Sequence, residues 1–148
     1  MTSATSSRSS TAWVWLLVIG VAALFRTLNI WESFWIDEAM SAAVIEEPWD
    51  ILVTRVGFSD VHPPGYYLFL KSWSTLFGTS DVALLALSWL ASMGATVWVT
   101  AWALRRYGSL IAVFAGLALA TSTFHVHYAV EARSYALFGF LTLAFMLS

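Results

Sequence analysis

Residues 82–104 read VALLALSWLASMGATVWVTAWAL and contain no charged side chain. A helix needs about 20 mostly apolar residues to cross the hydrocarbon core of a bilayer. This stretch therefore predicts a membrane-spanning helix, and it is the clearest one in the chain.

The composition of the whole chain agrees with a membrane protein. Its 148 residues are 59% hydrophobic and only 11% charged, whereas ordinary soluble domains carry about 25% charged residues. The net charge is -2 and no basic stripe is present, so nucleic acid is not an expected partner. The absence of cysteine excludes disulfides and thiolate metal sites. We expect an all-α, multi-pass protein in contact with membrane lipids.

Three more apolar stretches, residues 12–30, 109–127 and 135–148, bring the expected number of spans to about four. Trp13 and Trp31 flank the first stretch, as the aromatic belts of membrane proteins do. The last stretch stops within an apolar run and would cover only about 21 Å as a helix, against a core of ~30 Å. We therefore expect an incomplete fourth span, at the end of the N-terminal portion of a longer protein.

The distribution of charge predicts an orientation in the cell membrane. Arg105 and Arg106 lie in a very short turn between two spans, and the positive-inside rule assigns such a turn to the cytoplasm. The Ser/Thr-rich residues 1–11, expected to be a disordered tail, then also lie in the cytoplasm. Most acidic residues fall in the loop 31–81, which is expected outside.

This outer loop is too long to be a plain connector, and it contains two helix signals. Pro48 suits the first turn of a helix that runs to about Phe58. After Pro63 and Pro64, the run GYYLFLKSWSTLF has a broad apolar face but is too short to span a bilayer easily. It predicts an interfacial helix that lies in the headgroup plane.

Two adjacent carboxylates, Asp37 and Glu38, stand in the apolar sequence FWIDEAMS. A partly desolvated carboxylate has a raised proton affinity unless a cation or a donor stabilises it, and this suits a general base. Neighbouring residues on a helix point about 100° apart, so different roles are more plausible than a shared proton. The alternative is that both groups are simply solvated beside the membrane.

A second polar group, Asp60 and His62, precedes the double proline in SDVHPPGYY. The prolines fix two φ angles and would hold both side chains at a stiff corner. The same residues would equally suit a helix start with no catalytic role. Lys71, further along, would either bind a phosphate or extend its amine to the membrane surface.

The third polar group is HVHYAVEARSY, residues 125–135. His125 and His127 point apart on a helix, so no metal site is predicted, although a divalent cation stays open as a cofactor. Arg133 has the planar donor fork that suits a phosphate. Glu131 and Arg133 would otherwise form an interface pair.

In order and spacing, the three motifs WIDEA, DVHPPGYYLFLKSWSTLFGTSD and HVHYAVEARSYAL resemble the opening of a GT-C glycosyltransferase. More narrowly, they resemble the superfamily of protein O-mannosyltransferases and lipid A aminoarabinose transferases, glycosyltransferase family 39 and its bacterial relatives. The resemblance covers the chain from about Trp13 to its end. One departure is that Leu85 and Leu87 stand where many bacterial relatives carry an arginine and a proline.

The resemblance implies an enzyme that transfers a sugar, with inversion, from a polyprenyl-phosphate donor to an acceptor hydroxyl at the outer face of the membrane. The acceptor would be a protein, a lipid or a glycan. Asp37 would be the catalytic carboxylate, with Glu38 beside it as a support for the acceptor or the donor, and the segment from Asp60 to Pro64 would line the same cavity. His62 stands where relatives place a lysine near the donor phosphate, and the ExRxY pattern matches the residues Glu131, Arg133 and Tyr135.

A different class of function stays open beside this one. The chain would then be a non-catalytic membrane protein, or an inactive fragment, that binds polyprenyl phosphate or a partner subunit. A transporter fragment is less favoured, because residues 82–104 carry no charge at mid-span.

Overall fold

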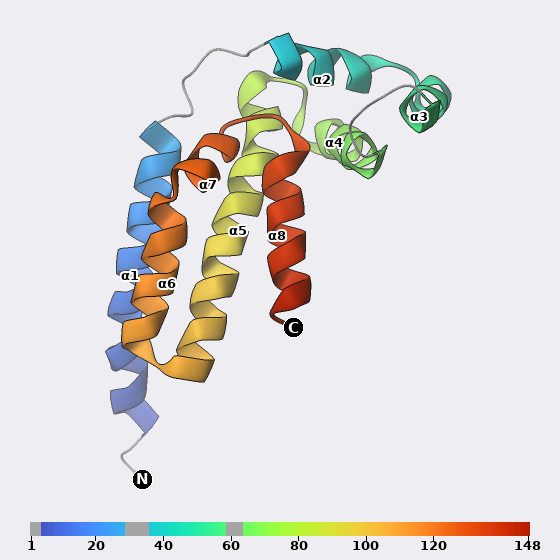
Figure 1. Ribbon diagram of the computed structural model, residues 1–148. Coiled ribbons are helices and arrows are strands. Elements are labelled where there is room, and N and C mark those ends of the chain that lie inside the picture. Colours follow the sequence, from blue (N-terminus) through green and yellow to red (C-terminus); the bar gives the residue numbers. More distant parts are fainter. Residues whose placement is uncertain (1–3, 29–35, 59–63) are drawn as a thin grey trace.

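The computed structural model describes residues 4–28, 36–58 and 64–148, and every regular element in these ranges is a helix. Four helices run side by side as a bundle: α1 (Ala4–Leu28), α5 (Asp81–Tyr107), α6 (Ser109–Thr121) and α8 (Ser134–Met146) (Figure 1). Helix α5 is the central one, because it contacts α1, α6 and α8. The expected all-α class is confirmed for these residues.

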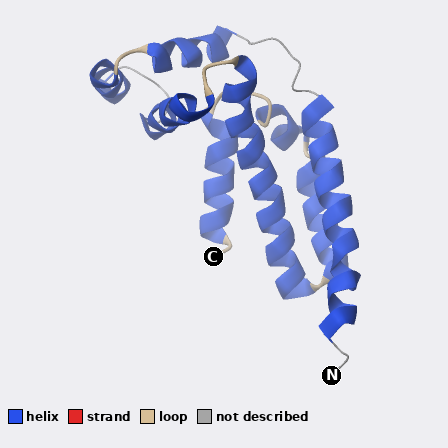
Figure 2. Cartoon of the chain, turned by 180° about the vertical axis from the view of Figure 1, so that it is seen from behind, coloured by secondary structure: helices blue, strands red, loops and turns tan. Residues whose placement is uncertain are grey.

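The remaining helices gather at one end of the bundle, as the views from both sides show (Figures 1 and 2). They are α2 (Ile36–Glu46), α3 (Trp49–Phe58), α4 (Pro64–Phe77) and the short α7 (Thr123–Tyr128). Helix α3 begins directly after Pro48 and α4 begins at Pro64, where the two proline signals lie in the sequence. We call this end of the bundle the polar end.

Among the described residues, two helices are long and apolar enough to cross a membrane, α1 over Thr11–Leu28 and α5 over Asp81–Tyr107. They correspond to the spans expected at 12–30 and 82–104. Helices α6 and α8 are apolar but shorter. Large apolar side chains on all four bundle helices are exposed, among them Leu16, Leu24, Leu90, Phe114, Leu141 and Phe145. An exposed apolar surface of this kind typically marks contact with a membrane or a partner.

Two boundaries differ from the expected ones. Helix α1 begins at Ala4, inside the expected tail 1–11; neither glycine nor proline interrupts residues 4–11, so the helix of the apolar segment continues into them. The expected span 109–127 is divided at Ser122, whose backbone is extended with φ -60° and ψ 120°. Ser and Thr compete for helical backbone groups, and the sequence Thr-Ser-Thr at residues 121–123 marks the division.

The opposite end of the bundle holds the tight turn between α5 and α6. Gly108 connects the two helices with a positive φ of 83°, a conformation that favours glycine. Arg105 and Arg106 lie in the last turn of α5, where positive charge interacts favourably with the helix dipole. The basic turn and the acidic polar end therefore lie at opposite ends of the molecule (Figure 1).

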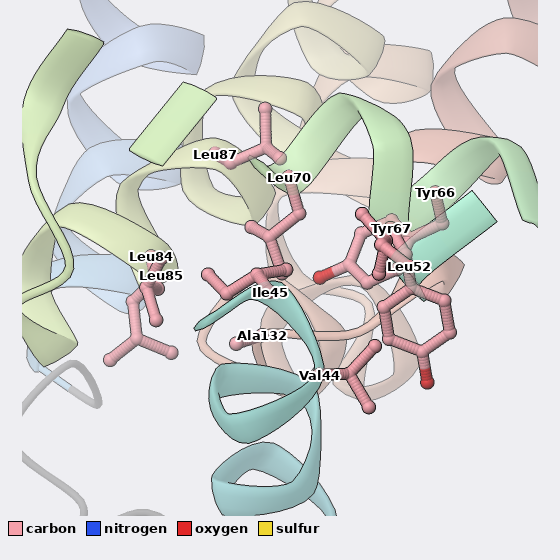
Figure 3. Packing of buried hydrophobic residues seen from close by; sticks show 10 residues of the cluster. All are labelled: Val44, Ile45, Leu52, Tyr66, Tyr67, Leu70, Leu84, Leu85, Leu87 and Ala132. Carbon is pink, nitrogen blue, oxygen red and sulfur yellow. The ribbon is translucent and has the colours of Figure 1, made fainter. Parts of the chain in front are cut away.

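An apolar cluster attaches α2, α3 and α4 to the bundle. Figure 3 shows its ten buried residues, which are Val44, Ile45, Leu52, Tyr66, Tyr67, Leu70, Leu84, Leu85, Leu87 and Ala132. The indole nitrogen of Trp73 on α4 also donates a hydrogen bond to the carbonyl of Ala83 on α5 over 2.7 Å. Burying the apolar groups supplies the driving force, and the indole bond orients α4 against the first turn of α5.

Candidate functional site

Glu38 joins two of the three sequence motifs. It lies in the first turn of α2 and is only 4% exposed. Its Oε1 accepts a hydrogen bond of 2.8 Å from the backbone amide of Ala132. Ala132 belongs to residues 129–133, which connect α7 to α8 and which we call the 129–133 segment. The bond therefore holds WIDEA against HVHYAVEARSY at the polar end.

Tyr66 on α4 also lies at the polar end. Burial raises the pKa of its hydroxyl far above the usual value, and Tyr67 and the carboxylate of Glu38 raise it further, whereas Ser88 and Arg133 lower it. The hydroxyl thus stays protonated and is available as a donor. Its Oη makes no hydrogen bond of good geometry with the described residues.

Ser88 on α5 completes the group, because its hydroxyl donates to the carbonyl of Arg133 over 3.5 Å. The candidate site is therefore defined by Glu38, Tyr66, Ser88 and Arg133. These residues come from α2, α4, α5 and the 129–133 segment. The candidate site thus combines a carboxylate, a neutral donor and a guanidinium, which are the groups that could accept a proton and bind an anion.

Glu131 and Arg133, both in the 129–133 segment, contact different helices: Glu131 contacts α7 and Arg133 contacts α8. The guanidinium of Arg133 lies 5.1 Å from the ring centre of Tyr135, and that ring packs on the ring of Tyr128 at an angle of 50°, with the ring centres 4.5 Å apart. Glu131 Oε1 lies 2.9 Å from Nε2 of His127, one helical turn back. The structure thus brings Glu131, Arg133 and Tyr135 together at the polar end, and Arg133 is the one of the three that links them to Ser88.

Lys71 on α4 is buried against the end of α2. Its side chain is 8% exposed, and its ammonium donates to the carbonyl of Ile45 over 2.7 Å and to the carbonyl of Glu47. It also lies 5.2 Å from the ring centre of Trp49. A cation satisfies the unpaired carbonyls at a helix C-terminus well. Lys71 therefore closes the end of α2, whereas Glu38 lies in the first turn of that helix.

The buried Arg26 was not predicted as a functional residue, although an arginine near the end of an apolar span is a recognisable signal. It is fully buried among α1, α5 and α6. Its guanidinium donates to Ser92 Oγ at 2.9 Å, Thr96 Oγ1 at 3.2 Å, the Ala22 carbonyl at 3.1 Å and the Ala120 carbonyl at 3.2 Å. A second signal is the spacing of four between buried hydroxyl residues of α5, namely Ser88, Ser92, Thr96 and Thr100.

Three of the predicted site residues lie wholly or partly outside the described residues. Asp60 and His62 fall in the range 59–63, and Asp37 is a helical residue of α2 whose side chain is not among those described. Within the described part of the chain, no group of three His, Cys, Asp or Glu is placed to hold a metal ion. No family model, curated protein or solved structure matches the chain.

Proposed function

We propose that this chain is the N-terminal part of a membrane glycosyltransferase of the GT-C type. It would transfer a sugar from a polyprenyl-phosphate donor to an acceptor hydroxyl at the outer membrane surface, with the polar end outside and the N-terminus in the cytoplasm. The observation that carries the proposal is the bond between Glu38 and the amide of Ala132. It joins the acidic motif to the arginine motif at one end of an apolar helix bundle.

The proposed membrane arrangement has four spans. These are α1, α5, α6 continued by α7, and α8, with α2, α3 and α4 at the outer surface. Exposed apolar residues of α3 and α4, including Trp49, Ile51, Phe69 and Phe77, suit the interfacial position. A polyprenyl donor cannot leave the bilayer, so a site at the end of the bundle lies at the depth of the donor phosphate.

The proposed reaction is a direct displacement at the anomeric carbon. The acceptor oxygen forms a bond to this carbon while the bond from the carbon to the phosphate oxygen breaks, and the electron pair leaves with polyprenyl phosphate. Asp37 takes the proton of the acceptor hydroxyl. Attack from the side opposite the leaving phosphate inverts the configuration.

The described residues would support this step by electrostatics. The guanidinium of Arg133 is suited to the charge that develops on the departing phosphate. The hydroxyl of Tyr66, which remains protonated, would add a neutral donor. Glu38 fixes the position of the 129–133 segment through its bond to Ala132. No step of this proposal involves a divalent cation.

The test is a transfer assay on membranes from cells that express the complete reading frame, with radiolabelled polyprenyl-phosphate sugars as donors. Asp37→Asn removes the proposed base with little change in shape, so we expect transfer to fall by about 10²–10⁴-fold. Asp50→Asn is the matched control, because Asp50 is an exposed carboxylate on the neighbouring helix α3. Equal activity in both variants would remove Asp37 from the mechanism.

A non-catalytic lipid-binding protein is the second candidate. One observation favours it: Glu38 and Lys71 both bind backbone groups of this chain. Such a protein, purified in detergent, would bind the radiolabelled donor, and Arg133→Gln would reduce that binding. The wild type would then show binding but no transfer with protein, lipid or glycan acceptors.

A further inference from the structure

The division between α6 and α7 creates carbonyl groups that have no partner within their own helix. The last carbonyls of any α-helix lack helical donors, and α7 is only six residues long. Two side chains from other helices satisfy such carbonyls. Arg26 on α1 donates to the Ala120 carbonyl over 3.2 Å, and Ser92 on α5 donates to the His125 carbonyl over 3.1 Å.

Arg26 and Ser92 also bind each other, and this makes one continuous chain of contacts. Nε of Arg26 donates to Ser92 Oγ at 2.9 Å, and the same hydroxyl donates its own proton to His125. The chain thus runs from α1 through α5 to α7. Both side chains are fully buried; the hydrogen bond between them is buried, and the bond from Ser92 to the carbonyl of His125 is part-buried.

The charge of Arg26 is balanced in an unusual way. Its guanidinium donates to two hydroxyls and two backbone carbonyls, and all four acceptors are neutral. The carbonyl end of a helix carries a partial negative charge of about half a unit, and the Ala120 carbonyl lies in the last turn of α6. The guanidinium therefore binds where α6 ends and fixes the direction in which the chain continues.

Helix α7 leads directly into the 129–133 segment, which carries the amide bound by Glu38 and the side chain of Arg133. We propose that Arg26 and Ser92 are positioning residues that set α7, and through it the 129–133 segment, against Glu38. Their importance for sugar transfer rests on the proposed glycosyltransferase function. Their effect on the position of α7 does not depend on that function.

Two residues of α5 provide a matched comparison. Ser92 and Thr96 are both fully buried, both accept from Arg26, and lie one helical turn apart. Thr96 donates to the carbonyl of Ser92 within its own helix, whereas Ser92 donates to α7. Ser92→Ala should therefore move α7, and Thr96→Val should leave it in place, although each variant removes one hydrogen bond of Arg26.

The chain contains no cysteine, so two introduced cysteines can be labelled uniquely. Ala43 on α2 and Thr123 on α7 are both exposed, and Ala43→Cys with Thr123→Cys gives a pair of spin labels across the polar end. We expect Ser92→Ala to shift the distance distribution by more than its wild-type width. Arg26→Lys should do the same, because a single ammonium cannot replace the fork that reaches both Ser92 and Ala120.

Thr96→Val and the exposed-arginine control Arg106→Gln should keep the wild-type distribution. An unchanged distance in Ser92→Ala and Arg26→Lys, or equal shifts in Ser92→Ala and Thr96→Val, would overturn the positioning role. The transfer assay on the same variants separates the two proposals. A shift in distance with no transfer in the wild type would keep the positioning role and reject the enzyme.

Discussion

The carboxylate of Glu38 and the backbone amide of Ala132 are joined by a buried hydrogen bond of 2.8 Å, although 94 positions separate the two residues in the sequence. Helix α2 packs chiefly on α4, and this bond ties its first turn directly to the segment before α8. A carboxylate that accepts from a backbone amide makes a charge-assisted contact, and such contacts are about twice as strong as neutral ones.

Replacing Glu38 should release the 129–133 segment. Glu38→Ala leaves a buried amide without its acceptor, which costs about 1–3 kcal/mol, whereas Glu38→Gln keeps an acceptor oxygen and should lose less. Hydrogen exchange at the Ala132 amide, measured by NMR or on short peptides, should accelerate in the order wild type, Gln, Ala. Glu46→Ala on the exposed face of the same helix is the control. Wild-type exchange in Glu38→Ala would show that the bond does not hold the segment.

Lys71 offers a test between a structural and a substrate-binding role. Lys71→Met keeps the length of the side chain but removes the donor to the carbonyls of Ile45 and Glu47. We expect the melting temperature to fall, with a loss of about 1–3 kcal/mol, and Lys71→Arg to recover part of it. If binding of the radiolabelled donor to the detergent-purified protein falls while the melting temperature is unchanged, Lys71 binds substrate instead.

The buried Tyr66 predicts a loss of stability at alkaline pH. Its pKa is raised by burial in the folded state above the ordinary value of 10.0. Above about pH 10 the unfolded chain releases this proton and the folded chain keeps it, so the free energy of unfolding falls as pH rises. Below that pH the contribution of the protonated Tyr66 to the free energy of unfolding is fully present.

Thermal unfolding of the wild type and of Tyr66→Phe between about pH 8 and 11 would measure this effect. The difference between the two proteins should be constant up to about pH 9 and should then change in favour of Phe. Tyr107→Phe serves as the control, because Tyr107 is 58% exposed. Parallel curves for wild type and Tyr66→Phe would contradict the buried, protonated state.

Much of the architecture was predictable from local patterns. The uncharged run 82–104 and the two proline signals correspond to α5, α3 and α4, because span length and helix starts depend on neighbouring residues. The division of 109–127 at Ser122 was missed. Overall hydrophobicity does not reveal it, since Arg26 and Ser92 from other helices satisfy the carbonyls that the division exposes.

The candidate site was predictable only in part, for a similar reason. Carboxylates and arginines in an apolar sequence single out Glu38 and Arg133. The contributions of Tyr66 and Ser88 depend on how α4 and α5 pack, and in the sequence they look like ordinary members of apolar runs. For Lys71 the sequence indicates the residue but not its contacts. Its charge marks it as a candidate, whereas its partners are carbonyls about 25 residues earlier in the chain, which no local pattern indicates.

Gly116 should be the least replaceable glycine of the bundle. A Cβ at this position of α6 would collide with Oγ1 of Thr100 on α5 and would lie 2.7 Å from Cγ1 of Val18 on α1. Moving Thr100 would disturb its hydrogen bond of 2.7 Å to the carbonyl of Thr96. Overpacking of this kind costs about 1–3 kcal/mol, so Gly116→Ala should lower the melting temperature in detergent.

Gly20→Ala is the control for this prediction. A Cβ at this position of α1 meets nothing within 4 Å, so the variant should gain about 0.5–1 kcal/mol from helix propensity. Thr100→Ala combined with Gly116→Ala should recover part of the loss, since the two sites interact directly; simple additivity of the two changes would place the strain elsewhere.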